Sequence, residues 1–144
     1  IIKSLLSTVL SYSIRFHERA YHDEVSKKHT DSLGERFKHA VHSHLNELLL
    51  NLAQEAKSVS SYADDLAVTS SHLSETIRKE LGQTPTDYIN DRIVKEAQKL
   101  LLSTELQVKE IAYLLKFKDT SYFGRLFRKI SGQTPAQYRQ ESAE

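Results

Sequence analysis

Two segments of the chain, fifty residues apart, repeat one pattern of hydrogen-bonding residues at helical spacing. Positions i, i+3, i+4 and i+7 share one face of a helix. In the two segments those positions hold Ser71, Ser74, Glu75 and Arg78, and Ser121, Gly124, Arg125 and Arg128. Hydroxyl and guanidinium groups donate hydrogen bonds to phosphate oxygens and guanine edges, and a carboxylate accepts one from the cytosine amino group. These residue types therefore predict contacts with double-stranded DNA, and Gly124 would let the DNA approach the helix backbone closely.

Positive charge gathers around the second of these segments. From Lys116 to Lys129 the sequence holds five cations and one anion, whereas the net charge of the whole chain is +1. A chain so close to neutrality gives no general argument for a nucleic-acid partner, and a solvated helix face would carry charges of this kind too. Because an Arg-Lys pair recurs in both segments, we favour DNA binding over a solvated face. The cations expected to contact phosphates are Arg78, Lys79, Lys118, Arg128 and Lys129.

Both segments lie inside an internal repeat. The motif at 82–85, Gly-Gln-Thr-Pro, recurs at 132–135. Further upstream the copies match at an offset of forty-nine instead of fifty, which places Val59, Ala63 and Leu66 opposite Val108, Ala112 and Leu115. A turn around Lys118 and Asp119 would absorb the one-residue difference. Two copies are too few for a solenoid, so the repeat predicts a duplicated supersecondary unit.

Each copy of the repeat predicts a helix, a short turn and a second helix, which is the helix-turn-helix pattern. In the first copy, a helix over 59–67 capped by Ser58 is expected before a polar break at 69–71 and a second helix that ends at Leu81. In the second copy, Asp119 is the expected cap of the second helix. The apolar residues expected to point inward are Leu73, Ile77 and Leu81, and Phe123, Phe127 and Ile130.

The Gly-Gln-Thr-Pro motifs predict how the second helix of each copy ends and the next one begins. Gly82 stands where a left-handed residue commonly ends a helix, and Thr84-Pro85 is a cap followed by proline in the first helical turn. The new helix is expected over 85–102, with an apolar stripe of Ile89, Ile93, Ala97 and Leu100. At ~1.5 Å per residue this helix would be roughly 26 Å long. With the width of the two units added, it could match the ~34 Å between successive major-groove faces of DNA.

The composition is that of an ordinary globular domain, with 39% hydrophobic and 27% charged residues. Four glycines and two prolines leave little room for the turns of an all-β fold. With no cysteine, disulfides, thiolate zinc sites and cysteine nucleophiles are excluded. No apolar run approaches the ~18 residues of a membrane span, so no membrane partner is expected. We expect an all-α fold of two helix-turn-helix subdomains, at about 58–82 and 107–132, joined by a long helix and preceded by an extra amphipathic helix.

The front third divides into an amphipathic helix at 1–20, a polar linker at 21–31 and the start of a DNA-binding domain at 32–144. The first helix carries an apolar stripe at heptad spacing, formed by Ile2, Leu5, Val9, Tyr12 and Phe16. Two interpretations stay open for it, packing on the core of the same chain or a weak contact between two copies. A second helix is expected over 33–56, begun by Ser32 and Glu35 as a capping box. Its apolar stripe is Phe37, Val41, Leu45, Leu48 and Leu52.

Neither a catalytic centre nor a metal site is predicted. His39, His42 and His44 are close in sequence, but His44 falls on another face of a helix and a zinc site needs converging ligands. Solvated or partly packed histidines are the favoured interpretation. Asp64 and Asp65 point about 100° apart on a helix and could not share a substrate. Phosphate-binding, G-x-S-x-G and H-E-x-x-H motifs are absent, so no enzyme, cofactor or metal is expected.

Residues 58–140 resemble the DNA-binding domain of the AraC/XylS family of bacterial transcription regulators. The resemblance rests on Ala63-x-x-Leu66, Ser71-x-Leu73-Ser74, Ile111-Ala112, Ser121-Tyr122-Phe123, Phe127-Arg128-Lys129 and the two Gly-Gln-Thr-Pro-x-x-Tyr motifs that end at Tyr88 and Tyr138. It implies two recognition helices that read adjacent major-groove segments. The base contacts that it implies come from Ser71, Ser74 and Glu75 in the first helix, and from Thr120, Ser121, Gly124 and Arg125 in the second.

The resemblance also bears on partners and on the rest of the protein. Family members often carry a sensor domain before the DNA-binding domain, so the chain, which begins without methionine, is expected to be the tail of a longer cytoplasmic regulator. RNA polymerase would then be a further partner. The competing hypothesis is a helical protein–protein adaptor that keeps the duplicated scaffold without binding DNA.

Overall fold

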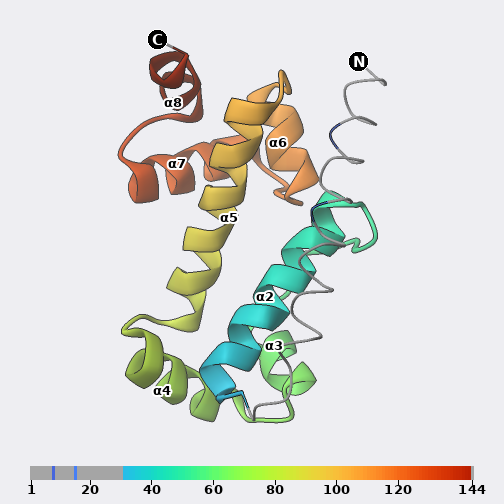
Figure 1. Ribbon diagram of the computed structural model, residues 1–144, viewed down its shortest axis with the longest axis vertical. Coiled ribbons are helices and arrows are strands. Elements are labelled where there is room, and N and C mark those ends of the chain that lie inside the picture. The colour runs from blue at the N-terminus through green and yellow to red at the C-terminus, as the bar shows by residue number, and fades with distance from the viewer. Residues whose placement is uncertain (1–7, 9–14, 16–30, 144) are drawn as a thin grey trace.

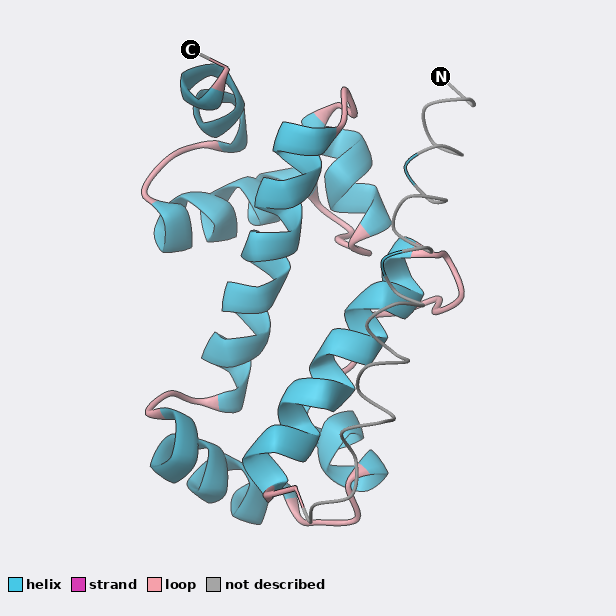
Figure 2. Ribbon diagram, in the orientation of Figure 1, coloured by secondary structure: helices cyan, strands magenta, loops and turns pink. Residues whose placement is uncertain are grey.

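The computed structural model describes residues 8, 15 and 31–143, and the ordered elements of 31–143 are all α-helices (Figure 2). The predicted all-α class is confirmed for this part of the chain. The helices are α2 (Leu33–Leu49), α3 (Val59–Asp65), α4 (Ser70–Leu81), α5 (Pro85–Ser103), α6 (Val108–Leu114), α7 (Thr120–Ser131) and α8 (Pro135–Ser142). Apart from Thr8 and Arg15, the helix expected at 1–20 lies outside the described residues, as does the linker expected at 21–31 apart from Asp31.

A single long helix, α5, joins two groups of shorter helices (Figure 1). The first unit contains α2, α3 and α4, which pack against one another, and α2 and α4 also pack against α5. The second unit contains α6, α7 and α8, each of which packs against α5. In the view of Figure 1, α4 and α7 lie at opposite ends of α5 and on the same side of it. The fold therefore presents the second helix of each repeat copy from one flank of the molecule.

Aromatic side chains anchor the core of each unit. In the first unit, Phe37 of α2 packs edge-on against Tyr62 of α3, with 5.7 Å between ring centroids, and lies 5.5 Å from the Tyr88 ring at the start of α5. In the second unit, Phe127 of α7 lies 6.0 Å from Phe123 and 5.7 Å from Tyr138 of α8. Aromatic rings bury large apolar areas and add specific edge-to-face contacts. The repeat motif that ends in tyrosine thus ties each unit to the helix that follows it.

The helix boundaries around the Gly-Gln-Thr-Pro motifs are confirmed. Gly82 and Gly132 have φ angles of +71° and +82°, and their N–H groups donate to the carbonyls of Arg78 and Arg128. A left-handed residue at this position is the usual way to close a helix, and glycine adopts it without a steric penalty. The Thr84 hydroxyl then accepts a hydrogen bond from the Asp87 N–H at 3.1 Å, which begins α5.

The helix predicted over 33–56 is shorter in the structure and ends at Leu49. Asn51 adopts φ +57°, and the N–H groups of Asn51 and Leu52 donate to the carbonyls of Leu48 and Glu47 at 3.0 and 2.8 Å. This is a Schellman closure, in which asparagine takes the place usually held by glycine. Leu52, predicted as part of the buried stripe, is therefore 73% exposed.

Two further expectations within the repeat are wrong in detail. The polar break predicted at 69–71 lies earlier, because α4 begins at Ser70 with Thr69 as its cap and α3 ends at Asp65. Ile130, predicted to point inward, is 36% exposed. It lies in the last turn of α7, which extends away from α5 (Figure 1), and Leu126 takes the buried place beside Phe123 and Phe127 instead.

Candidate nucleic-acid interface

The face of α4 expected to read DNA points away from the core. Ser71, Glu75 and Arg78 are exposed and Ser74 is half-buried, whereas Leu73 and Ile77 on the opposite side are fully buried. Each hydrogen-bonding side chain of this face is therefore at the surface or at its edge, because the buried stripe fixes the rotation of the helix.

The corresponding face of α7 has the same orientation with a different chemistry. Thr120, Ser121 and Arg125 are exposed, and Arg125 is the long cationic side chain at the centre of this face. Glu75 holds the matching position in α4. An arginine can donate two hydrogen bonds to guanine, whereas a glutamate can accept from cytosine. The two faces are thus suited to different bases.

Gly124 has no packing role inside the protein. A Cβ atom built on it would meet no heavy atom within 4 Å, so an alanine would fit there. Glycine in the middle of a helix costs about 1 kcal/mol relative to alanine. The glycine leaves the backbone of α7 open to a molecule that approaches from outside.

The cations expected to contact phosphates surround these faces. Arg78, Lys79, Lys118, Arg128 and Lys129 are all exposed. Within the described residues, none of the five forms an ion pair with an acidic side chain, which leaves their charges available for an anionic partner. Asp119, the one anion in this region, accepts a hydrogen bond from the Ser121 N–H at 2.9 Å and so holds the first turn of α7.

The turns between the paired helices differ by one residue, as the repeat predicts. Ala67 and Lys116 hold the same place in the two turns, with φ angles of +57° and +64°. The next N–H in each turn donates back to α3 or α6, from Val68 to Ala63 and from Phe117 to Ala112. The extra residue of the second turn follows Phe117, so Lys118 stands between the turn and the cap of α7.

One contact that positions α4 was not predicted from the sequence. The Glu80 carboxylate in its last turn accepts hydrogen bonds from the Gly34 N–H at 2.9 Å and the Ser32 hydroxyl at 3.0 Å. A carboxylate at the N-terminus of a helix satisfies free N–H groups and is favoured by the helix dipole. The recognition helix of the first unit is therefore fastened to the start of α2. The sequence carries one sign of a separate role for Glu80. The two copies of the repeat differ at this position, where the second copy has Ile130.

Two arginines to which the sequence assigned no role bind helix ends near the interface. Arg139 of α8 donates to the carbonyls of Leu101 and Thr104 at 3.0 and 3.2 Å, at the C-terminus of α5. Arg36 of α2 donates to the Leu66 carbonyl at 3.2 Å, in the turn before α4. Cations at helix C-termini satisfy free carbonyls and complement the helix dipole.

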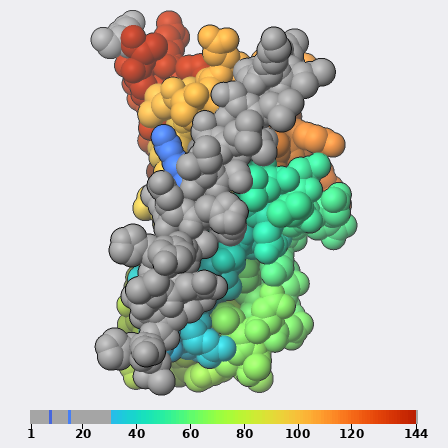
Figure 3. Space-filling view, turned by 45° about the vertical axis from the view of Figure 1, so that its right-hand side comes forward, coloured from blue at the N-terminus to red at the C-terminus, as the bar shows by residue number. Residues whose placement is uncertain are grey.

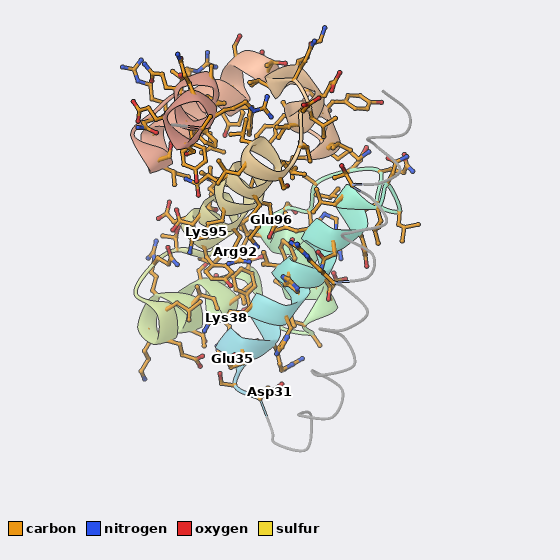
Figure 4. All side chains as sticks on the ribbon, turned by 45° about the horizontal axis from the view of Figure 1, so that its top comes forward. Asp31, Glu35, Lys38, Arg92, Lys95 and Glu96 are labelled. Atoms are coloured by element: carbon orange, nitrogen blue, oxygen red, sulfur yellow. The ribbon has the colours of Figure 1, made fainter. Side chains whose placement is uncertain are left out.

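Charged side chains also pair along α5 and along α2, each within its own helix (Figure 4). Glu96 of α5 is only 4% exposed, and its carboxylate pairs with Lys99 at 3.1 Å and with Arg92 at 3.8 Å. On α2, Lys38 pairs with Glu35 at 3.0 Å. A buried carboxylate needs such partners, so Arg92 and Lys99 are occupied within the protein.

The histidines have individual surroundings. His44 is 4% exposed, and its Nε2 accepts a hydrogen bond from the Lys57 N–H at 3.2 Å. Burial, aided by the nearby Lys57 charge, lowers the pKa of His44 below its ordinary value, so the neutral form is favoured. His39 and His42 are half-buried. Among residues 31–143 no group of three His, Cys, Asp or Glu side chains is arranged to hold a metal ion.

Within the part of the chain that the structure describes, no helix has the length and apolar character needed to cross a bilayer.

Comparisons with known proteins agree with this geometry. Residues 62–141 match the family model described as a helix-turn-helix domain. The C-terminal domain of AraT, a response regulator from Geobacillus stearothermophilus, superimposes with a TM-score of 0.68 at 30% identity, over 77% of this chain and 86% of that one. The DNA-binding domain of AdpA, a global transcriptional factor solved in complex with a target DNA, gives a TM-score of 0.65 at 25% identity, over 78% of this chain and 93% of that one.

Sequence relatives are much longer proteins. Histidine kinase P4 of Formosa agariphila is 30% identical over 94 residues, which are 65% of this chain and 7% of that protein. Three of the curated relatives are covered over only 7%, 9% and 29% of their length. The similarity therefore concerns one domain of each relative.

The family model, the repeat and the two exposed recognition helices agree. The chain belongs to the AraC/XylS-type helix-turn-helix family of DNA-binding transcription regulators.

Proposed function

We propose that α4 and α7 enter adjacent major-groove segments of one DNA duplex and together read its sequence. The observation that carries this proposal is that α4 and α7, whose hydrogen-bonding side chains are largely exposed, lie at opposite ends of α5 and on the same side of it (Figure 1). The 19 residues of α5 make a helix of about 28 Å. That length, with part of the width of each unit, is close to the ~34 Å between successive major-groove faces.

The residue roles follow from exposure and reach. Base contacts are assigned to Ser71, Ser74 and Glu75 of α4, and to Thr120, Ser121, Gly124 and Arg125 of α7. Phosphate contacts are assigned to Arg78, Lys79, Lys118, Arg128 and Lys129, which flank those faces. Phosphate contacts fix the position of a protein on the duplex, whereas contacts with base edges carry sequence information.

The activity of this chain is then DNA binding rather than catalysis, and residues 32–144 form the DNA-binding domain, with helix-turn-helix units at about 58–82 and 107–132. Relatives such as the kinase carry further parts, and we infer that this chain belongs to a longer regulator that acts on bacterial DNA in the cytoplasm and through RNA polymerase.

We also propose weak self-association through the apolar stripe of Ile2, Leu5, Val9, Tyr12 and Phe16. A dimer would bind paired sites on DNA. Sedimentation of the chain and of a Leu5→Asp, Val9→Asp variant tests this. If the unaltered chain and the variant are both monomeric, the proposal is contradicted.

A pool of random duplexes tests the DNA-binding proposal directly. The chain should enrich a common sequence from the pool, and its affinity for the enriched duplex should fall steeply with salt because phosphate contacts release counterions. Lys109→Ala, which removes a cation from α6 on the side that borders α2, is the matched control for substitutions on α4 and α7. If no sequence is enriched and the binding of the chain to DNA does not depend on salt, the adaptor hypothesis is favoured.

A further inference from the structure

Among the described residues, one side-chain hydrogen bond joins the two units directly. Lys116 Nζ donates a hydrogen bond to Asn51 Oδ1 at 2.7 Å, across 65 residues of sequence. Asn51 lies just after α2 in the first unit, and Lys116 lies in the turn between α6 and α7 of the second. The helix pairs with extensive packing otherwise lie within one unit or involve α5. Figure 3 shows the two surfaces meeting on one face, the second unit in orange next to the end of α2 in teal.

Hollow surface surrounds this contact. A cavity of about 560 Å³ opens on one side, between Gln54–Ala56 and Phe117, and another of about 570 Å³ opens on the other side, between Leu49 and Leu106. Lys116 and Tyr113 line both cavities. Apolar packing therefore leaves hollow surface between the two units here, and the Lys116 side chain spans from the second unit to the first.

The backbone of Lys116 indicates that its side chain is needed for more than the turn. A left-handed conformation at φ +64° is unfavourable for lysine and easy for glycine. The first unit has Ala67 at the same place, with φ +57°, so the turn itself needs no long side chain. Lys116 Nζ also lies 5.7 Å from the centre of the Tyr113 ring, and its bond to Asn51 brings the ammonium to the C-terminal end of α2, where a helix favours a cation.

We propose that the Asn51–Lys116 bridge fixes the angle between the two helix-turn-helix units and so presets the spacing at which α4 and α7 meet DNA. This inference rests on the proposed reading of one duplex by both helices. Lys116 and Asn51 act here as positioning residues, since neither needs to touch DNA. A pair of modules held in a fixed relation binds two adjacent sites more tightly than the same modules on a looser connection, because less freedom is lost on binding.

Distance measurements between spin labels test the bridge without DNA. The chain has no cysteine, so Ser60→Cys on α3 and Ala136→Cys on α8, both exposed, accept one label each. Lys116→Ala and Asn51→Gly should broaden the distribution of label distances between the units. Asn51→Asp, which keeps an acceptor oxygen for the ammonium, and Lys109→Ala, a control on α6, should retain the narrow distribution. Equal widths in all five proteins, including the one with only the two labels, would overturn the proposal.

Spacing preference on DNA tests the consequence. The duplex enriched by the unaltered chain is compared with one that has a single base pair inserted between the two contacted segments. Lys116→Ala should bind the enriched duplex about three- to tenfold more weakly and should lose much of the discrimination against the insertion. Unchanged affinity and discrimination, alongside an unchanged fold by circular dichroism, would contradict the proposed role. If no duplex is enriched at all, the proposed function fails, while the label distances still decide whether the bridge sets the angle.

Discussion

Glu80 at the end of α4 accepts a hydrogen bond from the backbone N–H of Gly34 at the start of α2, at 2.9 Å. The two residues are 46 positions apart, and the same carboxylate oxygen also accepts from Ser32. A Cβ atom on residue 34 would overlap that oxygen, so a glycine here allows the close approach. The recognition helix of the first unit is thus held by an acidic cap on another helix rather than by apolar packing alone.

Glu80→Ala should lower the free energy of unfolding by about 1–2 kcal/mol, because the N–H groups at the start of α2 lose their acceptor. Gly34→Ala should destabilise the protein as well. If the two residues act through one contact, the double variant should lose less than the sum of the single losses. Denaturant unfolding of the four proteins measures this, with Lys79→Ala as a control on the same helix turn. Additive losses would show that the contact is not the cause.

Ala67→Gly should raise the free energy of unfolding by about 0.5–1 kcal/mol, since glycine adopts φ +57° without the steric cost that alanine meets. Ala136→Gly is the matched control, because Ala136 lies in α8 and glycine is unfavourable inside a helix. The two substitutions should therefore have opposite signs in denaturant unfolding. Destabilisation by Ala67→Gly would mean that the alanine methyl group makes contacts worth more than the strain.

The stability of the chain should decrease as the pH falls below the ordinary histidine pKa of about 6.5. The folded state lowers the pKa of His44, mainly through burial. The unfolded chain therefore binds more protons in this range, and the stability lost on acidification levels off below the folded pKa. His44→Gln, whose side-chain oxygen can still accept from the Lys57 N–H, should be less pH-dependent than the unaltered chain. Identical pH profiles in denaturant unfolding would rule out His44 as the source.

Much of this architecture could be predicted from the sequence, because the repeat carries its own boundary signals. The glycine closures, the Thr-Pro starts and the exposed faces of α4 and α7 all follow from local patterns. The end of α2 at Leu49 was missed because asparagine, rather than glycine, closes the helix. The contacts of Glu80 with Gly34 and of Lys116 with Asn51 join residues 46 and 65 positions apart, and no local pattern predicts which distant groups will meet.

Arg125→Ala should weaken binding to the enriched duplex by about 1–3 kcal/mol and relax the preference at one or two base pairs, because the guanidinium is the long donor at the centre of the α7 face. The fold should be unaffected, since Arg125 is exposed. Repeating the selection with the variant measures the preference, and Lys109→Ala controls for the lost charge. An unchanged preference and affinity would place base reading on another face.

Lys118→Ala should weaken binding to all duplexes alike, because a phosphate contact carries no sequence information. The slope of log affinity against log salt should become shallower by about 0.9, the contribution of one neutralised phosphate. Titration of the enriched duplex and of a scrambled duplex at several salt concentrations gives both slopes. A loss restricted to one base-pair preference would contradict the assigned role.

The arrangement of conserved positions in the enriched duplexes tests the central claim most directly. If α4 and α7 read adjacent major-groove segments of one duplex, the selected sequences should contain two conserved blocks about 10 base pairs apart. Substitutions on α4 should erase one block and substitutions on α7 the other. The claim would be contradicted by a single conserved block that disappears when either α4 or α7 is altered. Two conserved blocks at variable spacing would contradict it as well.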